Sequence, residues 1–169
     1  MPRRLCALVS MLVVFGCASS KVSQTINTAH SGPKIRAVAL SPGGGVLADA
    51  IGVELFNRGF TVMDPSQAGT LLGRSDLTEF EIATSPNLQA LSEKGVDALL
   101  VVKSANAADG KPQSASVRLT NTKTQQVVAA VSWQNGWGGQ AGSMADRTMR
   151  KDVADAAKEI VDTLSKSMR

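Results

Sequence analysis

Two segments of the sequence share one arrangement, in which a helix-forming stretch stops at a glycine and an apolar extended stretch begins at once. They are Leu55–Asp64 (LFNRGFTVMD) and Leu91–Leu100 (LSEKGVDALL). Gly59 and Gly95 permit the left-handed turn that ends a helix, and the apolar residue after each glycine can fold back onto that helix. This alternation constrains the chain to a sheet covered by helices, rather than a helical bundle or a barrel.

The remaining segments extend the alternation over residues 34–169, which we predict to form one domain. Short apolar or β-branched runs predict strands, and apolar residues three and four positions apart predict helices. The predicted elements are strand 35–40, helix 46–58, strand 60–64, helix 65–73, helix 86–94, strand 97–104, strand 114–120, strand 126–133 and helix 143–168. Residues 76–84 are predicted to be a loop. The order βαβααβββα predicts an α/β two-layer sandwich, a mixed sheet covered by helices.

Some of these elements carry more specific expectations. The strand over 97–104 is the most apolar and is expected at the centre of the sheet, and the two strands after it are expected to form a hairpin. The helix over 46–58 has apolar residues at near-helical spacing, namely Leu47, Ala50, Ile51, Val53 and Leu55. The last helix is predicted to be continuous, with an inward face formed by Met149, Val153, Ala157, Ile160, Leu164 and Met168.

The start of the chain has the order of an export signal. Arg3 and Arg4 form a short basic region, Leu5–Phe15 is an almost unbroken apolar run, and Gly16 stands before Cys17. The apolar run is too short to cross a bilayer about 30 Å thick as a helix.

Because it ends on cysteine, this segment resembles a bacterial lipoprotein signal. The resemblance implies that residues 1–16 are removed and that Cys17 becomes diacylated. It also implies an anchor in the outer membrane, on its periplasmic face, because Ala18 stands where an Asp would resemble the inner-membrane retention signal.

Loss of the signal changes what the composition implies. Without Arg3 and Arg4 the chain has sixteen Lys and Arg against fourteen Asp and Glu, and the basic residues are spread out between acidic ones. No nucleic-acid partner is expected, since its footprint is a basic face or stripe. Cys6 leaves with the signal and Cys17 is acylated, so no thiol remains for a disulfide and packing alone must hold the fold.

Residues 17–33 are predicted to be the acylated cysteine and a flexible tether. Positions 18–33 are rich in Ser, Thr, Asn and Gln and show no sustained apolar period. Fully extended, this tether reaches about 50–55 Å, which keeps the domain close to its membrane.

The order of motifs resembles a family of periplasmic lipoproteins. The strand Ile35–Leu40 (IRAVAL), the GF-x-V-x-D motif at Gly59–Asp64 and the G-x-D-x-L-x-V motif at Gly95–Val101 are similar to those of TolB-N-terminal-like or CsgG-like domains. The resemblance covers residues 34–168 and implies that a hairpin and a C-terminal helix follow the motifs. These motifs are mostly packing features, so they specify fold more than function.

The family includes curli-export pores, exopolysaccharide-export ring lipoproteins and lipoprotein activators of penicillin-binding proteins. A pore needs extra membrane-spanning strands of about 9–11 residues, and the chain has no spare pair of such segments. The activators use a long tether to cross the cell-wall layer, whereas the predicted tether is short. We therefore predict a non-catalytic assembly or binding component of an envelope export system for polysaccharide or protein. Its partner is an envelope protein or a glycan, and the ring-forming members imply a homo-oligomer. The alternative is a regulator that docks on a peptidoglycan synthase and activates it.

Two tryptophans mark the most unusual segment of the mature chain. Trp133 ends the last predicted strand, and Trp137 lies in the Gly-rich stretch that follows (WQNGWGG). Large rings on such a loop favour the water–headgroup boundary of a membrane or the pocket of a partner. We predict both as membrane or partner contacts, Trp137 first, and for Trp133 packing beneath the C-terminal helix is an equal alternative.

Other candidate sites have ordinary explanations. Backbone N–H groups at Gly43–Gly45 could hold an anion, but the run lacks a nucleotide-binding motif and is better explained as a strand-to-helix turn. Asp76, Glu79 and Glu81 could bind a cation or a basic glycan, although a solvated loop is favoured. His30 has no neighbouring ligand for zinc, which needs three or four. We predict neither a metal site nor a cofactor.

Catalytic arrangements are scarce as well. His30 is the single histidine and no free thiol remains, so neither a Ser-His-Asp nor a Cys-His arrangement can form within the domain. A carboxylate pair that acts on cell-wall or exported glycan stays open as a third hypothesis, but no motif points to one. We expect that the protein is not an enzyme.

Overall fold

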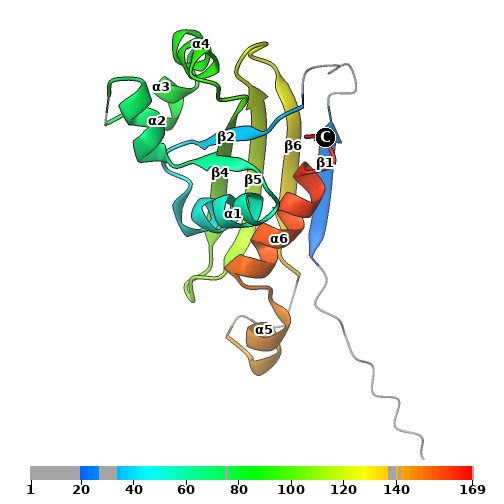
Figure 1. Ribbon diagram of the computed structural model, residues 1–169. Coiled ribbons are helices and arrows are strands. Elements are labelled where there is room, and N and C mark those ends of the chain that lie inside the picture. The colour runs from blue at the N-terminus through cyan, green and yellow to red at the C-terminus, as the bar shows by residue number, and fades with distance from the viewer. Residues whose placement is uncertain (1–19, 27–33, 75, 137–139, 141, 169) are drawn as a thin grey trace, which may run out of the picture.

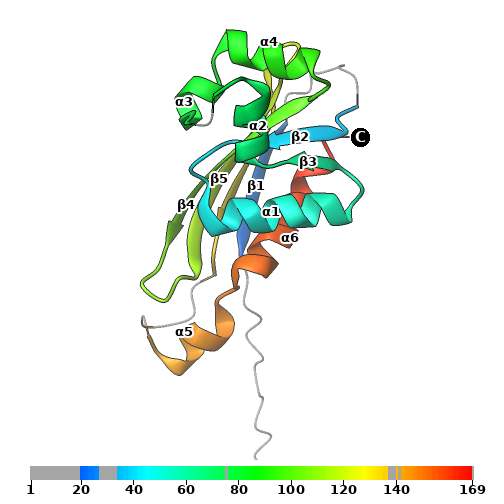
Figure 2. The ribbon, with the colours of Figure 1, turned by 60° about the vertical axis from the view of Figure 1, so that its left-hand side comes forward.

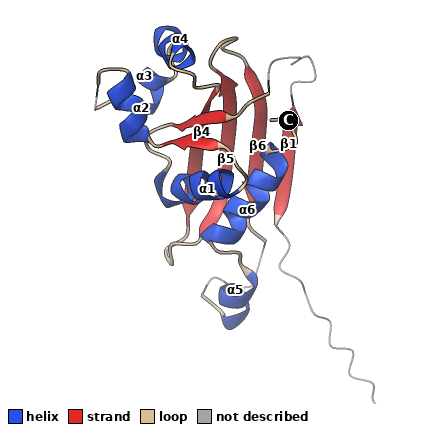
Figure 3. Cartoon of the chain, in the orientation of Figure 1, coloured by secondary structure: helices blue, strands red, loops and turns tan. Residues whose placement is uncertain are grey.

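A computed structural model describes residues 20–26, 34–74, 76–136, 140 and 142–168. Its strands form one six-stranded sheet, with helices packed against it and α5 beyond one end (Figures 1 and 3). The elements are, in chain order, β1 (Lys21–Ile26), β2 (Ala37–Leu40), α1 (Gly45–Asn57), β3 (Thr61–Met63), α2 (Pro65–Leu71), α3 (Glu79–Ile82), α4 (Ser85–Glu93), β4 (Ala98–Asn106), β5 (Pro112–Asn121), β6 (Val127–Gln134), α5 (Met144–Met149) and α6 (Val153–Leu164). The predicted α/β class with a mixed sheet is confirmed.

The strand order is β1-β6-β5-β4-β2-β3. β2 pairs in parallel with both β3 and β4, while the other neighbours are antiparallel. The chain runs from β2 outward to β3 through α1, then back past β2 to β4 through α2, α3 and α4. Because crossovers are right-handed, two that run in opposite directions place their helices on opposite faces of the sheet. β4 lies between β5 and β2, inside the sheet as predicted, and β5 and β6 form the predicted hairpin.

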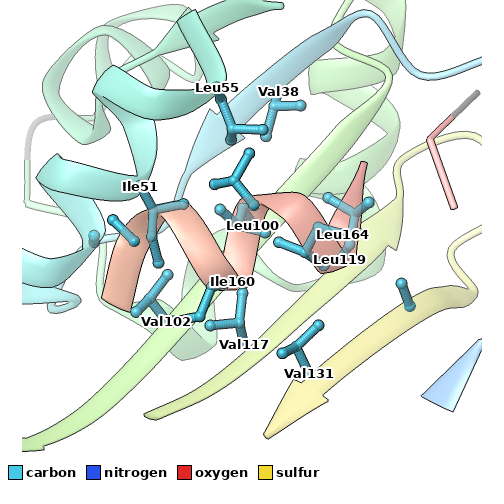
Figure 4. Close-up of a cluster of buried hydrophobic side chains, with 14 of the residues drawn as sticks. Val38, Ile51, Leu55, Leu100, Val102, Val117, Leu119, Val131, Ile160 and Leu164 are labelled. Carbon is cyan, nitrogen blue, oxygen red and sulfur yellow. The ribbon is translucent and has the colours of Figure 1, made fainter. Parts of the chain in front are cut away.

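The main core lies between the sheet and the two long helices α1 and α6. Ile51 and Leu55 of α1 and Ile160 of α6 point at Leu100 and Val117 of the central strands (Figure 4). The four buried residues on the predicted inward face of the last helix are Ala157, Ile160, Leu164 and Met168. These two helices thus cover the central part of this face, while Ser104 and Asn106 at the end of β4 are exposed.

The opposite face is covered at one end alone. There α2, α3 and α4 pack a smaller apolar cluster, which includes Ile82 and Leu91, against Leu99. Beyond that cluster the strands present exposed polar side chains such as Ser116 and Ser132, with no helix over them in the described part of the chain (Figure 2). An antiparallel sheet commonly leaves one face in water in this way.

Both glycine turns form as predicted. Gly59 and Gly95 have φ of 86° and 83°. In the first turn the N–H of Gly59 donates to the carbonyl of Phe56 (2.9 Å), and the N–H of Phe60 donates to that of Leu55 (3.2 Å). These bonds satisfy the last carbonyls of α1 and aim the chain into β3.

The loop predicted over residues 76–84 contains the short helix α3. Thr78 and Glu81 form a capping box, in which each side chain accepts the other residue's backbone N–H. Ile82 is fully buried beneath this turn. The loop prediction was wrong because a Thr-x-x-Glu pattern and one buried residue suffice for a helix of one turn.

The helix predicted over 143–168 is broken into α5 and α6. Asn135 uses its side chain to accept the N–H of Lys151 (3.0 Å) and to donate to the carbonyl of the same residue (2.9 Å). Asp152 then begins α6 by accepting the N–H of Asp155 (2.9 Å). The prediction of a continuous helix was wrong. The apolar spacing continues through residues 150–152, but the N–H and carbonyl groups of Lys151 bond to Asn135 and not to helix neighbours.

The predicted tether contains a strand. β1 pairs with β6 over its whole length, with Val22 opposite Trp133. Gln24 donates to the carbonyl of Thr163 (3.0 Å) and to the hydroxyl of Ser167 (2.8 Å). The flexible-tether prediction was therefore wrong for residues 21–26. The strand was missed because Gln24 occupies an inward position, where an apolar residue would have produced the alternating pattern typical of a strand.

Candidate functional site

Two of the predicted site residues, Cys17 and Trp137, lie outside the residues that the structure describes, and so does His30. The description begins at Ser20, three positions after Cys17. Within the described residues, no helix is both long and apolar enough to cross a membrane.

Trp133 is a core residue. Its side chain is 0 % exposed, and its ring N–H donates to Oε2 of Glu159 on α6 (2.8 Å). The residue lies on β6 between Val22 of β1 and Ala115 of β5, on the face that α6 covers. The prediction of Trp133 as a membrane or partner contact is therefore wrong, and its alternative, packing beneath the C-terminal helix, is confirmed.

Glu159 joins the start of the described chain to the last helix. Besides the Trp133 ring, its carboxylate accepts the Ser20 hydroxyl and pairs with the ammonium of Lys151. Burial alone would raise the pKa of Glu159, but these hydrogen bonds and the Lys151 charge outweigh it and hold the pKa below its usual value. The ionised carboxylate thus fixes Ser20 against α6.

The end of the molecule where β1 begins also carries α5 (Figures 1 and 2). We call it the anchor end. Arg150 holds α5 in place, because its guanidinium lies 2.7 Å from Asp146 and 2.6 Å from Asp109 in the β4–β5 turn. At the start of α5 the side chain of Met144 is 83 % exposed, and Arg147 is exposed one turn later. This end therefore presents an apolar and a basic side chain on a braced helix.

The acidic segment is paired with cations of the chain itself. The distances are 3.7 Å from Arg74 to Asp76, 2.9 Å from Arg74 to Glu81 and 3.2 Å from Lys103 to Glu79. The backbone N–H and the hydroxyl of Thr78, followed by Arg74, lower the pKa of Glu81 to about 2. Among the described residues, no three His, Cys, Asp or Glu side chains are grouped to hold a metal ion.

The glycine run has a packing role. A Cβ at Gly44 would lie 2.4 Å from the Cβ of Ala48 and 3.3 Å from that of Val102 on β4. A side chain at this position would therefore clash with the first turn of α1 and crowd β4, which explains the residue type without an anion.

One exposed surface was not predicted. Val46, Val53 and Phe56 are 69 %, 62 % and 69 % exposed on the side of α1 that points away from the sheet. With the exposed Asp49 between them, we call this surface the outer face of α1. Val53 belongs to the apolar spacing predicted for this helix, whereas the residues of α1 buried in the core are Leu47, Ala48, Ile51, Gly52 and Leu55. The sequence carried one sign of this surface, because the segment over 46–58 has more apolar residues than one buried helix face can hold.

Comparisons with known proteins identify the fold. No family model matches the chain, and no curated protein matches it. The lipoprotein GNA1162 from Neisseria meningitidis has a similar structure, with a TM-score of 0.50 and 14 % identity over 79 % of this chain and 99 % of that one.

Two further solved structures are less similar. The PelC dodecamer from Paraburkholderia phytofirmans gives a TM-score of 0.48 at 14 % identity, over 87 % of this chain and 98 % of that one. The LpoB C-terminal domain from Salmonella enterica gives 0.43 at 18 % identity, over 60 % and 84 %. At these identities the comparisons establish a shared fold with GNA1162 and leave function to the residues of this chain.

Proposed function

We propose that this chain is a lipid-anchored, non-catalytic module of the bacterial envelope, held at the periplasmic face of the outer membrane by acyl chains on Cys17. The observation that carries the proposal is the position of β1, which brings the folded domain to within three residues of Cys17. Three residues span at most about 11 Å. The domain therefore lies against the membrane that holds the acyl chains, with its anchor end nearest.

Within that role we propose an assembly or binding component of an export system for polysaccharide or protein, as the TolB-N-terminal-like or CsgG-like resemblance implies. The short link supports this choice over a regulator of peptidoglycan synthase, because a domain at the membrane surface cannot reach across the cell-wall layer. Its partner must come to the membrane. The single histidine, His30, and the lack of a thiol other than Cys6 and Cys17 support a non-catalytic role.

Replacement of the anchor residue tests the proposal. Cys17→Ser is expected to move the protein from the sedimented membranes to the soluble periplasmic fraction, while the wild type stays with the outer membrane. If the variant still sediments with membranes, the lipid-anchor proposal fails. Affinity purification of the wild-type protein then separates the two roles, since a secretion channel supports export and a peptidoglycan synthase supports regulation.

A vesicle-binding assay tests Trp137, which we propose as a contact with the membrane. In the Cys17→Ser background, Trp137→Ala is expected to weaken the residual binding to outer-membrane lipid vesicles and to leave the thermal midpoint within about 2 °C, since exposed substitutions change stability little. A large drop in the midpoint would show instead that Trp137 is a core residue. Arg118→Ala on the uncovered sheet face is the matched control.

A further inference from the structure

The outer face of α1 collects most of the strongly exposed apolar surface. Five large hydrophobic side chains of the described residues are more than 60 % exposed, and three of these lie on α1, at Val46, Val53 and Phe56. The other two, Phe80 and Met144, lie on separate helices. Single exposed apolar residues are ordinary, whereas a contiguous group marks an interaction surface.

These residues contribute nothing to α1 as an isolated helix. Valine is β-branched and loses side-chain freedom in a helix, so an exposed Val46 or Val53 is a poorer choice than Ala, Lys or Glu. The core of the domain makes no use of them, because Ile51 and Leu55 already fill its side of the helix. A contact outside the described structure is the remaining physical use for them.

The spacing of the outer face indicates a helix as its partner. Val46, Asp49, Val53 and Phe56 follow one another at steps of three, four and three, which is the repeat of the a and d positions of a coiled coil. A helix laid along α1 would contact all four residues. The face spans three of the four turns of α1, so a partner helix of about ten residues covers it.

Asp49 argues against a second copy of this chain as the partner. A second α1 on this face would bring Asp49 against its own counterpart or against Val53, and would bury a carboxylate with no cation beside it. Asp49 has no hydrogen bond or ion pair with any described residue. A partner with a Lys or Arg at this point would satisfy the charge.

The flank of the face is acidic as well. Arg58 lies 2.7 Å from both Glu54 and Asp162, so this cluster carries one net negative charge beside that of Asp49. Such a flank disfavours the anionic surface of a membrane and favours a basic segment. α1 also lies farther from the anchor end than α5 does (Figures 1 and 2).

We propose that the outer face of α1 docks an amphipathic helix of another protein, with apolar residues at coiled-coil spacing and a Lys or Arg opposite Asp49. The inference deepens the proposed function by naming the chemistry of the partner, and it rests on that function for the place where the two meet. The contact itself does not involve Cys17, so the two proposals can fail separately.

The test is photo-crosslinking in the living bacterium with the full-length protein. A benzophenone amino acid replaces Val53, and in the control it replaces Ser132 on the uncovered sheet face. We expect an adduct from position 53 alone, whose peptide maps to a basic amphipathic helix of another protein. A peptide of this same chain, a lipid adduct, an acidic or non-helical segment, or no adduct above the Ser132 control would each overturn the proposal.

A charge exchange tests the role of Asp49. In the crosslinking chain, Asp49→Lys is expected to lower the adduct yield about tenfold, and a Lys→Asp or Arg→Asp change at the mapped position of the partner is expected to restore it. Asp49→Asn should give an intermediate yield, and an unchanged thermal midpoint for all variants excludes misfolding. An unchanged yield with Asp49→Lys would overturn the proposed pairing. Membrane fractionation of the same cells shows independently whether the protein is still anchored to the membrane.

Discussion

At the scale of single residues, Glu159 joins parts of the described chain that are distant in sequence. Its carboxylate holds Ser20, the Trp133 ring and Lys151 at once. Such a group is stabilising while it is charged, because the ionised carboxylate accepts from all three donors and balances the charge of Lys151 in a half-buried site.

Glu159→Gln tests this role. The amide can still accept from Trp133 but cannot pair with Lys151, so we expect the free energy of unfolding at pH 7 to fall by about 1–2 kcal/mol. Urea unfolding of residues 18–169, followed by tryptophan fluorescence, measures the change. Asp49→Asn is the control, since that carboxylate is exposed and has no partner among the described residues. It should leave the midpoint unchanged.

The same variant has a defined pH dependence. Because the pKa of Glu159 is lower in the folded chain than in the unfolded chain, its contribution is complete above the unfolded value of about 4.3 and is lost as the pH falls through the folded value. The difference in stability between wild type and Glu159→Gln should therefore be constant from pH 7 to pH 5 and shrink below that. A constant difference down to pH 3 would contradict the ion-pair explanation.

Single residues also show what the sequence could not determine. Trp133 and Val53 are both large and apolar, and both fit the period of their element, yet one is fully buried and the other is 62 % exposed. The spacing of apolar residues in the sequence indicates which residues share a face. Whether that face is covered depends on the positions of the neighbouring elements. Trp133 is covered because α6 crosses β6, and Val53 lies on the side of α1 where the described chain places nothing.

At the scale of elements, the interior of the fold was predictable and its margins were not. The central strands carry strong apolar patterns, α1 and α4 end just before Gly59 and Gly95, and these elements were predicted close to their bounds. β1 and α3 were missed, because an edge strand and a single helical turn are held mainly by backbone pairing and caps. The break after α5 depends on Asn135, which is sixteen positions from its partner Lys151.

Removal of β1 tests whether it belongs to the folded domain. A chain of residues 27–169 loses the whole ladder to β6 and the two hydrogen bonds of Gln24 to α6 and the residues after it. We expect the free energy of unfolding to fall by more than about 3 kcal/mol relative to residues 18–169, since each lost bond costs about 1 kcal/mol. Urea unfolding gives the value.

The same deletion exposes a new sheet edge. β6 would present unpaired N–H and carbonyl groups, which promote association with other chains. Size-exclusion chromatography with light scattering should show residues 27–169 forming larger species than residues 18–169 at equal concentration. Two fragments with equal size and equal unfolding midpoints would restore the original view of residues 21–26 as a tether.

At the scale of the whole molecule, the fold class followed from the alternation of helix and strand, but the surfaces that matter did not. The anchor end and the outer face of α1 both arise from the way distant segments come together. β1 returns the chain start to α6, and the crossover from β2 to β3 leaves one side of α1 free in the described structure. Under the two proposals, one end of the domain faces the membrane and a separate side binds a partner.

Lengthening the link after Cys17 tests this division. A flexible insertion of 20 Gly and Ser residues between Ser19 and Ser20 leaves the anchor and the fold intact. It lowers the effective concentration of the anchor end at the membrane by roughly twentyfold, since this concentration falls as about the −3/2 power of link length. A benzophenone amino acid at Met144 should therefore form far fewer lipid adducts in the lengthened protein. The adduct from position 53 should persist, because its partner binds through α1.

If the lipid adducts are as abundant with the long link as with the short one, the short link is not what holds α5 at the bilayer. In that case the anchor end binds lipid through its own residues, with Met144 and Arg147 as the first to replace.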